Sequence, residues 1–322
     1  MASLRRFIEN TPNAEFLPEK GRYHLYVSLA CPFACRVLAA INLKGLQDYV
    51  DVTVTHPVMQ RTRPNDPNDK HTGWVFVDPQ VTPFLAGPTG KGQYSSEGCS
   101  PDPIHNATYV RDLYERVTKE PVRYSVPLLW DKKNDTIVST ESADMMRMFN
   151  TAFEGVHPTN IDLYPEFARK AIDEVNEWVG DAIIVGVYKA GFAPTQEAYA
   201  CAAEKLYTAL DRLEEILSVQ RYLVGNFITE ADLRLFVALI RFDVAYAPLY
   251  KLNKKLIRDY HNIFNYVCDI YQLPGIKETV NFGHIKSCYF GSQVNLNPTG
   301  IVPICPCLGN DYTVQHDRAR FV

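Results

Sequence analysis

Cys31 is the residue of this 322-residue chain whose position most favours chemistry. The segment Tyr23–Leu29 is rich in aromatic and β-branched residues and predicts a strand, and Pro32 suits the first turn of the helix that follows. Cys31 then stands at a helix N-terminus, where unpaired N–H groups and the positive end of the helix dipole favour thiolate over thiol. We therefore interpret Cys31 as a nucleophile in preference to a small buried hydrophobic residue.

The other cysteines give weaker signals. Cys35 follows Cys31 by four residues, which is not the C-x-x-C spacing of dithiol redox motifs. A buried structural Cys35 is favoured over a resolving thiol. Cys305 and Cys307 form a close pair, but no second Cys/His pair stands at finger-like spacing, so no metal site is predicted.

Two further segments have features of a ligand-binding site. A cis peptide bond at Val126-Pro127 would expose the backbone of Val126 to a bound peptide, although the same sequence is also ordinary for a strand. Glu141-Ser142 opens a helical pattern, where a hydroxyl group and free helical N–H groups can receive a carboxylate. A simple helix cap explains Glu141-Ser142 equally well.

The elements around these residues alternate between strand and helix. After the first strand and helix, the pattern predicts a strand at Asp51–Thr55, helices at Thr108–Val117 and Ser142–Phe149, and a hairpin over residues 126–138. Residues 57–104 are crowded with Pro, Gly, Asn and Asp and predict a long insertion without a sustained period. We assign residues 1–155 to an α/β domain with one mixed sheet.

From Tyr164 onward the period is helical. Apolar stripes run along Tyr199–Leu217, Leu233–Val244 and Ile257–Tyr271, as expected for the core faces of a helix bundle. Thr229 and Asp232 have the spacing of a capping box before the second stripe. Residues 160–322 are therefore assigned to an all-helical domain, with a proline-bearing tail after Phe290 laid over the surface in an extended form.

Composition narrows the classes of protein that fit. With 46% hydrophobic residues, 22% charged residues and a net charge of -4, the chain can bury a core, and neither a nucleic acid nor a membrane is expected as a partner. The N-terminus lacks the apolar stretch of a secretory signal, but its residues are compatible with a short organellar transit segment. Eight cysteines in this length favour a reducing compartment, and we expect a cytoplasmic protein.

Taken in order, these motifs resemble the glutathione transferases, and more narrowly the omega-like Xi class, the glutathionyl-hydroquinone reductases. The resemblance runs from about Tyr23 to about Pro306. The segments that carry it are CPFACR, HTGWVF, RYSVPLLWDKKNDTIVSTESADMMRMFN, GVYKAGFAPTQEAY, GNFITEADLRLFVALIRFD, DIYQLPGIKETVNFGHIKSCYF and NPTGIVPICP. The family's fold, a thioredoxin-like N-terminal domain followed by an all-α helical-bundle domain, agrees with the periodicity.

The resemblance also implies roles for single residues. Cys31 matches the catalytic cysteine of the family, and Tyr188 and Tyr289 match tyrosines that line its hydroquinone pocket. The glutathione-binding positions divide along the tripeptide: Val126 would pair with the cysteinyl part, Glu141 and Ser142 would hold the γ-glutamyl end, and Arg123 and Trp74 would serve the glycyl side. Glutathione is the implied co-substrate, and a homodimer joined through the helical domains is the implied assembly.

The implied reaction is the reductive deglutathionylation of glutathionyl-hydroquinones through a Cys31–glutathione mixed disulfide. An omega-like thioltransferase or dehydroascorbate reductase would use the same cysteine, and a non-catalytic binding protein on the same fold is the alternative from another class. Conjugating activity is disfavoured, because that chemistry uses Ser or Tyr at this position. The chain departs from the family at Phe33, where Trp is typical. It also departs at Cys35, whose extra thiol keeps an internal disulfide with Cys31 as an alternative.

Overall fold

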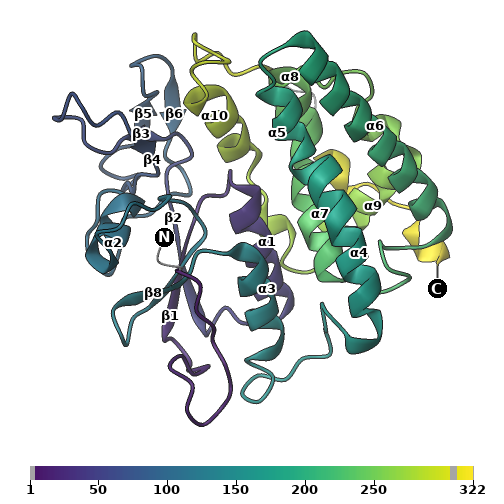
Figure 1. Ribbon diagram of the computed structural model, residues 1–322, viewed down its shortest axis with the longest axis horizontal. Helices are drawn as coiled ribbons and strands as arrows, with labels where there is room; N and C mark the ends of the chain where they lie inside the picture. Colours follow the sequence, from purple (N-terminus) through teal and green to yellow (C-terminus); the bar gives the residue numbers. More distant parts are fainter. Residues whose placement is uncertain (1–3, 305–309, 322) are drawn as a thin grey trace. The chain divides into compact units, whose positions relative to one another are not determined.

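The computed structural model describes residues 4–304 and 310–321 and divides the chain into two compact units (Figure 1). Unit 1 contains Met1–Asn160 and Thr279–Pro303, and unit 2 contains Ile161–Glu278 and Ile304–Val322. The sequence assigned all of residues 160–322 to the second domain, whereas the packing groups Thr279–Pro303 with unit 1. The cysteine pair Cys305 and Cys307 lies outside the described residues.

Unit 1 is built on a four-stranded mixed sheet in the order β2-β1-β7-β8. Its strands are β1 (Tyr23–Val27), β2 (Val50–Val54), β7 (Leu128–Asp131) and β8 (Thr136–Ser139). β1 pairs in parallel with β2 and antiparallel with β7, which pairs antiparallel with β8. The parallel pair needs a crossover connection, and α1 (Pro32–Leu43) supplies it. The predicted α/β arrangement and the predicted hairpin are both confirmed.

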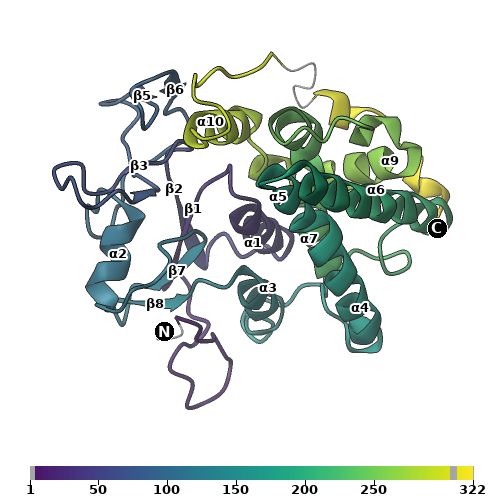
Figure 2. The same ribbon diagram turned by 45° about the horizontal axis from the view of Figure 1, so that its top comes forward.

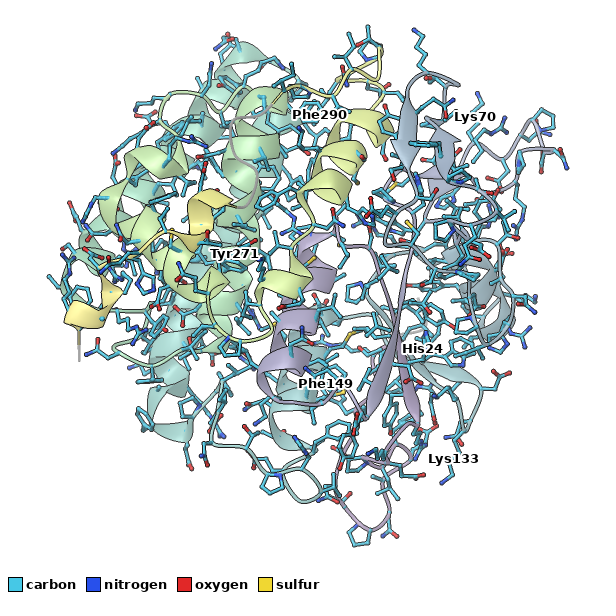
Figure 3. All side chains as sticks on the ribbon, turned by 180° about the vertical axis from the view of Figure 1, so that it is seen from behind. His24, Lys70, Lys133, Phe149, Tyr271 and Phe290 are labelled. Atoms are coloured by element: carbon cyan, nitrogen blue, oxygen red, sulfur yellow. The ribbon has the colours of Figure 1, made fainter. Side chains whose placement is uncertain are left out.

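The two faces of this sheet carry different helices. Figure 2 shows α1 and α3 (Ser142–Thr151) on one side and α2 (Val110–Val117) on the other. Alternation along β1 directs Tyr23 toward the first side, where its ring meets Phe153 edge-on at 6.4 Å. His24 faces the second side, is buried and hydrogen-bonds to Thr53 (Figure 3). The sheet is thus covered on both faces and can hold α1 and α3 firmly.

The predicted insertion over residues 57–104 contains four short strands. They pair antiparallel as β3 (Gln60–Arg61) with β4 (Thr72–Gly73) and β5 (Phe84–Ala86) with β6 (Gln93–Ser95). Strands of two or three residues are too short to show an alternating pattern, so the sequence did not predict them.

The helix α10 (Phe282–Ser292) packs against this insertion. His284 Nε2 donates to the carbonyl of Glu97 at 2.7 Å, and the Tyr94 hydroxyl donates to the carbonyl of Gly300 at 2.8 Å. A Cβ at Gly291 would meet the Tyr94 ring at 2.7 Å, so glycine permits this close approach. These contacts explain why Thr279–Pro303 belongs to unit 1.

Unit 2 is helical. Its helices are α4 (Arg169–Val179), α5 (Gly186–Gly191), α6 (Gln196–Val219), α7 (Glu230–Arg241), α8 (Ala247–Leu249) and α9 (His261–Tyr271). The first predicted stripe is confirmed on α6, where Leu206, Leu210, Leu213 and Leu217 are fully buried. None of the helices in the described part of the chain is long and apolar enough to cross a membrane.

The other two stripes are interrupted. The second continues from α7 into a π-helical turn at Phe242–Tyr246. The third was expected to begin at Ile257, but Ile257–Asp259 is a separate 3-10 turn, because Tyr260 has an extended backbone (φ -99°, ψ 113°) and α9 begins after it.

The predicted capping box at the start of α7 is confirmed and extended. Asp232 Oδ2 accepts from the N–H and the hydroxyl of Thr229, both at 2.8 Å. Its Oδ1 accepts from the N–H of Leu223 at 2.9 Å and from the hydroxyl of Tyr266 at 3.0 Å. Asp232 is fully buried, and this burial raises its pKa to about 6. One carboxyl group therefore ties α7 to the preceding loop and to α9.

The prediction of an extended surface tail is wrong for its described end. Asn310–Thr313 and Arg318–Arg320 form 3-10 turns, and Arg318 is fully buried. Arg318 donates to the carbonyls of Leu217 and Arg221 at 2.8 and 2.9 Å. The last carbonyls of a helix lack partners within the helix, and this guanidinium satisfies that of Leu217 in the last turn of α6 and that of Arg221 just beyond it.

Candidate active site

Cys31 occupies the N-cap position of α1, with an extended backbone (φ -79°, ψ 117°) and Pro32 as the first helical residue. Its carbonyl accepts the first helical hydrogen bond, from the N–H of Cys35 at 3.0 Å. Its side chain is partly exposed. The thiol therefore faces the end of a helix where backbone N–H groups lack helical partners, as the sequence predicted.

The peptide bond between Val126 and Pro127 is cis, which confirms the second prediction. The Cys31 thiol donates to the Val126 carbonyl at 3.5 Å, so the two predicted residues lie side by side. The N–H of Val126 makes no hydrogen bond with any residue that the structure describes. The segment before β7 therefore offers a backbone edge next to the thiol.

Glu141 and Ser142 open α3, directly after β8. The Glu141 side chain accepts from the N–H of Ala143 at 3.1 Å and is exposed. The Ser142 hydroxyl is buried and accepts from Arg36 Nε at 3.1 Å and from Nη2 at 2.6 Å. Arg36 comes from α1 and lies 3.9 Å from Glu141 Oε1. The starts of α1 and α3 are therefore joined by a buried guanidinium group.

A cavity of about 570 Å³ connects these groups within unit 1. Six of the residues predicted from the resemblance line it: Cys31, Trp74, Arg123, Val126, Glu141 and Ser142. A space of this size falls in the range of small-molecule sites. It combines a thiol, a free backbone edge and the N-terminal ends of two helices, which suits a peptide thiol with carboxylates.

The insertion supplies a further wall of this cavity, formed by Met59 and by the segment from His71 to Trp74. His71 and Tyr124 line the cavity, and their rings meet edge-on at 5.2 Å. Burial, together with the positive charge of Arg111, lowers the pKa of His71, so the imidazole is neutral at pH 7. Neither residue was predicted from the sequence to belong to the site. The available signal was the place of His71 within the segment HTGWVF, three residues before Trp74.

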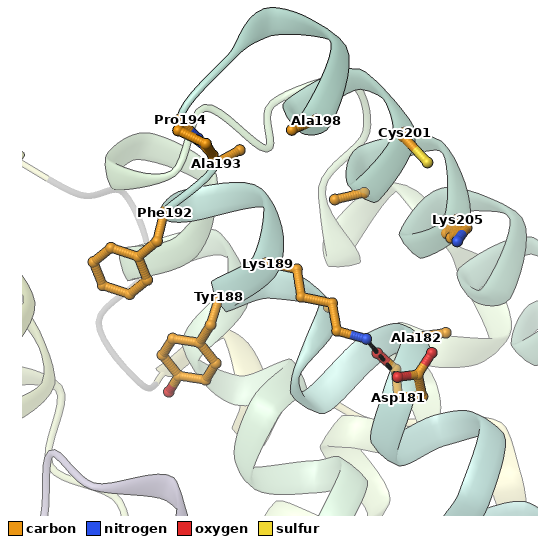
Figure 4. A pocket seen from close by; sticks show the side chains of 12 residues that line it. Asp181, Ala182, Tyr188, Lys189, Phe192, Ala193, Pro194, Ala198, Cys201 and Lys205 are labelled. Carbon is orange, nitrogen blue, oxygen red and sulfur yellow. Dashed lines mark hydrogen bonds and ion pairs between the residues drawn. The ribbon is translucent and has the colours of Figure 1, made fainter.

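The two predicted tyrosines do not line this cavity. Tyr289 lies on α10 in unit 1 and is 4% exposed. Tyr188 lies on α5 in unit 2, where it lines a separate cavity of about 410 Å³ together with Phe192 and Cys201 (Figure 4). Its hydroxyl group is 3.3 Å from that of Tyr246. The roles expected for both tyrosines stay predictions.

Cys35 is fully buried, and its thiol donates to the carbonyl of Leu29 at 3.3 Å. Both Cys31 and Cys35 are free thiols. This environment is that of the buried structural cysteine that the sequence favoured. No group of three or more His, Cys, Asp or Glu side chains suited to a metal occurs among the described residues.

Comparison with known proteins gives the family. Residues 30–152 match the glutathione S-transferase N-terminal domain and residues 165–267 match its C-terminal domain. The chain belongs to the glutathione transferase family. Among solved structures, the Xi 1 glutathione transferase of Trametes versicolor superposes with a TM-score of 0.84 at 43% identity, covering 95% of this chain and 98% of that one. This places the chain in the Xi class, as the resemblance indicated.

Two of the relatives are named after an enzyme activity. The chain is 46% identical to the glutathionyl-hydroquinone reductase YqjG of Escherichia coli, over 92% of this chain and 83% of that protein. The glutathione-bound structure of YqjG superposes with a TM-score of 0.87 at 42% identity and covers 99% and 97% of the two chains. The chain is also 37% identical to the glutathionyl-hydroquinone reductase PcpF of Sphingobium chlorophenolicum, over 91% and 86% of the two proteins.

Proposed function

We propose that this Xi-class transferase is a glutathionyl-hydroquinone reductase, with Cys31 as its nucleophile. The observation that carries the proposal is the cavity in which the Cys31 thiol lies beside the backbone of Val126 and shares walls with Ser142 and Trp74. The similarity to YqjG and PcpF names the substrate class.

Glutathione would bind as an extended peptide along the segment before β7. The free N–H of Val126 would pair with the cysteinyl part, which sets the glutathione sulfur beside Cys31. The α-carboxylate of the γ-glutamyl end would meet the N-terminus of α3, where the N–H groups favour negative charge. The fixed hydroxyl of Ser142 would donate to this carboxylate, and the side chain of Glu141 would accept from the ammonium group. Arg123 and Trp74 would hold the glycyl side.

In the first half of the reaction, the Cys31 thiolate attacks the sulfur of the glutathionyl-hydroquinone. A sulfur–sulfur bond forms and the bond between sulfur and the aromatic carbon breaks. The electron pair of the broken bond goes to the ring carbon, which takes a proton and leaves as hydroquinone. The two sulfurs are oxidised to a mixed disulfide, and the aromatic carbon is reduced.

In the second half, the thiolate of another glutathione attacks the mixed disulfide at the glutathione sulfur. Glutathione disulfide leaves and the Cys31 thiolate is regenerated. Tyr188 and Tyr289 are our candidates for proton donor and ring-oxygen partner. We further propose a cytoplasmic homodimer joined through the helical domains, for which light scattering should give twice the mass of the 322-residue chain.

Turnover of glutathionyl-menadiol by cysteine variants tests the assignment. Cys31→Ser should lower turnover by at least about a thousandfold, because it removes the nucleophile. Cys201→Ser is the matched control, since it changes an exposed thiol that lies outside the candidate active site. Unchanged turnover in Cys31→Ser contradicts the proposal. Faster turnover of a small glutathione mixed disulfide than of glutathionyl-menadiol favours a thioltransferase instead.

Mass spectrometry after incubation with glutathione disulfide gives a second, independent readout. A thiol with raised thiolate character should take one adduct of about 305 Da, and peptide mapping should place it on Cys31. An adduct that maps only to Cys201 would contradict the activation of Cys31.

A further inference from the structure

His71 is held in the cavity wall by a chain of hydrogen bonds that starts outside the cavity. Arg111 Nη1, from α2, donates to the Thr62 hydroxyl oxygen at 3.1 Å. The same oxygen lies 2.9 Å from His71 Nδ1. Thr62 is 1% exposed, so water does not compete for its hydroxyl group.

The direction of these bonds sets the position of the proton on the imidazole. A guanidinium group can only donate, so the Thr62 oxygen accepts from Arg111. The hydroxyl proton of Thr62 has two acceptors within reach, His71 Nδ1 at 2.9 Å and the His71 carbonyl at 3.4 Å, and the shorter distance favours Nδ1. Nδ1 is thus the acceptor, and the neutral ring carries its proton on Nε2. Burial and the charge of Arg111 keep the ring neutral by lowering its pKa.

The ring is also fixed from its side. Tyr124 meets the imidazole edge-on with an angle of 87° between the ring planes. Arg111 lies over the other ring of this pair, 5.2 Å from the centre of Tyr124, and the Tyr124 hydroxyl donates to Glu115 at 3.3 Å. His71 Nε2 makes no hydrogen bond with any described residue. The Nε2–H group of His71 is therefore a preorganised donor available to a ligand, on a side chain that lines the cavity.

The charges of the surrounding residues limit what this donor can meet. Arg111 is already paired with Asp69 and Glu115 and does not line the cavity, so its guanidinium group is not available to a ligand there. Arg123 also lines the cavity and forms no ion pair with a described residue. A neutral N–H donor together with an unpaired guanidinium group suits an anion with two acceptor oxygens, such as a carboxylate.

Glutathione carries two carboxylates, and the site separates them. The γ-glutamyl carboxylate is assigned to the start of α3, at Glu141 and Ser142. His71 stands on the insertion instead, joined through β4 to Trp74, and its partner Tyr124 is the neighbour of Arg123. We propose that His71 Nε2–H donates to the glycyl carboxylate of glutathione and makes the site specific for the complete tripeptide. This inference rests on the proposed function.

Equilibrium binding of two unreactive thioethers tests it. Calorimetry would compare S-methylglutathione with γ-glutamyl-S-methylcysteine, which lacks the glycine. His71→Ala should weaken S-methylglutathione binding by about tenfold and leave γ-glutamyl-S-methylcysteine binding unchanged. Only the first ligand has a carboxylate at the glycyl position, since the C-terminal carboxylate of the second lies one residue earlier, on the cysteinyl part. His71→Gln, whose amide N–H can take the place of Nε2–H, should retain most of the affinity.

Two more variants separate the donor from the surrounding loop. Lys70→Ala is the matched control, since Lys70 precedes His71 but is exposed and does not line the cavity (Figure 3). Thr62→Val keeps the volume but removes the hydroxyl that fixes the tautomer, so it should weaken S-methylglutathione selectively, by less than His71→Ala does.

Equal losses for both ligands in His71→Ala, or no loss for either, would overturn the role of His71. That failure differs from a failure of the proposed function, in which the wild-type protein would bind S-methylglutathione but would not reduce glutathionyl-menadiol. A wild-type protein that does not bind S-methylglutathione would overturn both.

Discussion

Asp232 should make the stability of this protein fall as the pH rises toward 7. The carboxyl group is fully buried, and burial raises its pKa from 3.8 to about 6 despite four hydrogen bonds that favour the ionised form. The pKa in the folded state therefore exceeds that in the unfolded state. A group shifted in this direction stabilises the fold fully below pH 3.8, and that contribution is lost as the pH rises through 6.

The magnitude follows from the two pKa values. A difference of about 2 units corresponds to about 3 kcal/mol in the free energy of unfolding between low pH and pH 7. Between pH 5 and pH 7, where most of the other carboxyl groups are already ionised, the same two values give a fall of about 1 kcal/mol.

Asp232→Asn is the reference variant, because it keeps the shape of the side chain and does not titrate. Urea denaturation of both proteins at pH 5, 6 and 7, at one protein concentration, gives the difference in unfolding free energy. The wild-type advantage over Asp232→Asn should shrink by about 1 kcal/mol from pH 5 to pH 7. A difference that stays constant or grows with pH would refute the reasoning and would mean that the four hydrogen bonds outweigh burial.

Three other variants probe the site and the helical unit. Ser142→Ala leaves two Arg36 N–H groups without their acceptor, so the free energy of unfolding should fall by about 1 to 3 kcal/mol in urea denaturation, and the KM for glutathione should rise. Cys35→Ala should keep the turnover of glutathionyl-menadiol within about threefold, since the buried thiol acts as a small apolar residue; a loss as large as that of Cys31→Ser would indicate a resolving thiol. Gly191→Ala places a Cβ 2.4 Å from the Tyr250 ring, and this overlap should cost about 1 to 3 kcal/mol, measured by thermal unfolding.

The local surroundings of Cys31 were predictable because short-range rules determine them. A strand, a helix-starting proline and a terminal thiol lie within ten residues, and each has its own sequence signal. The helix start at Ser142 is a similar case, whereas the sequence around the cis bond before Pro127 is also ordinary for a strand. Two further lining residues, Trp74 and Arg123, have no such local signal and were expected only from the resemblance to the glutathione transferases.

The wall formed by the insertion could not be predicted in the same way. The orientation of His71 depends on Thr62, nine residues earlier, and on Arg111, which is 49 residues beyond Thr62. None of these residues has a local pattern that indicates the others, because ion pairs and hydrogen bonds between distant segments leave no periodicity. The end of the tail was missed for the same reason, since Arg318 is held by carbonyls about a hundred residues away.

Phe33, where the resemblance leads us to expect Trp, contacts the group that connects α1 to α3. The Arg36 guanidinium lies over the Phe33 ring, 5.0 Å from its centre, while its N–H groups point to Ser142. A cation above a ring uses the negative face of the aromatic system and needs no N–H donor, so phenylalanine can support Arg36 without the indole N–H of a tryptophan. Arg36 in turn fixes the Ser142 hydroxyl. Phe33 therefore helps to hold in place the hydroxyl group that we propose for the γ-glutamyl end of glutathione. Phe33 thus supports, through Arg36, the connection between the helix of the nucleophile and the proposed binding helix.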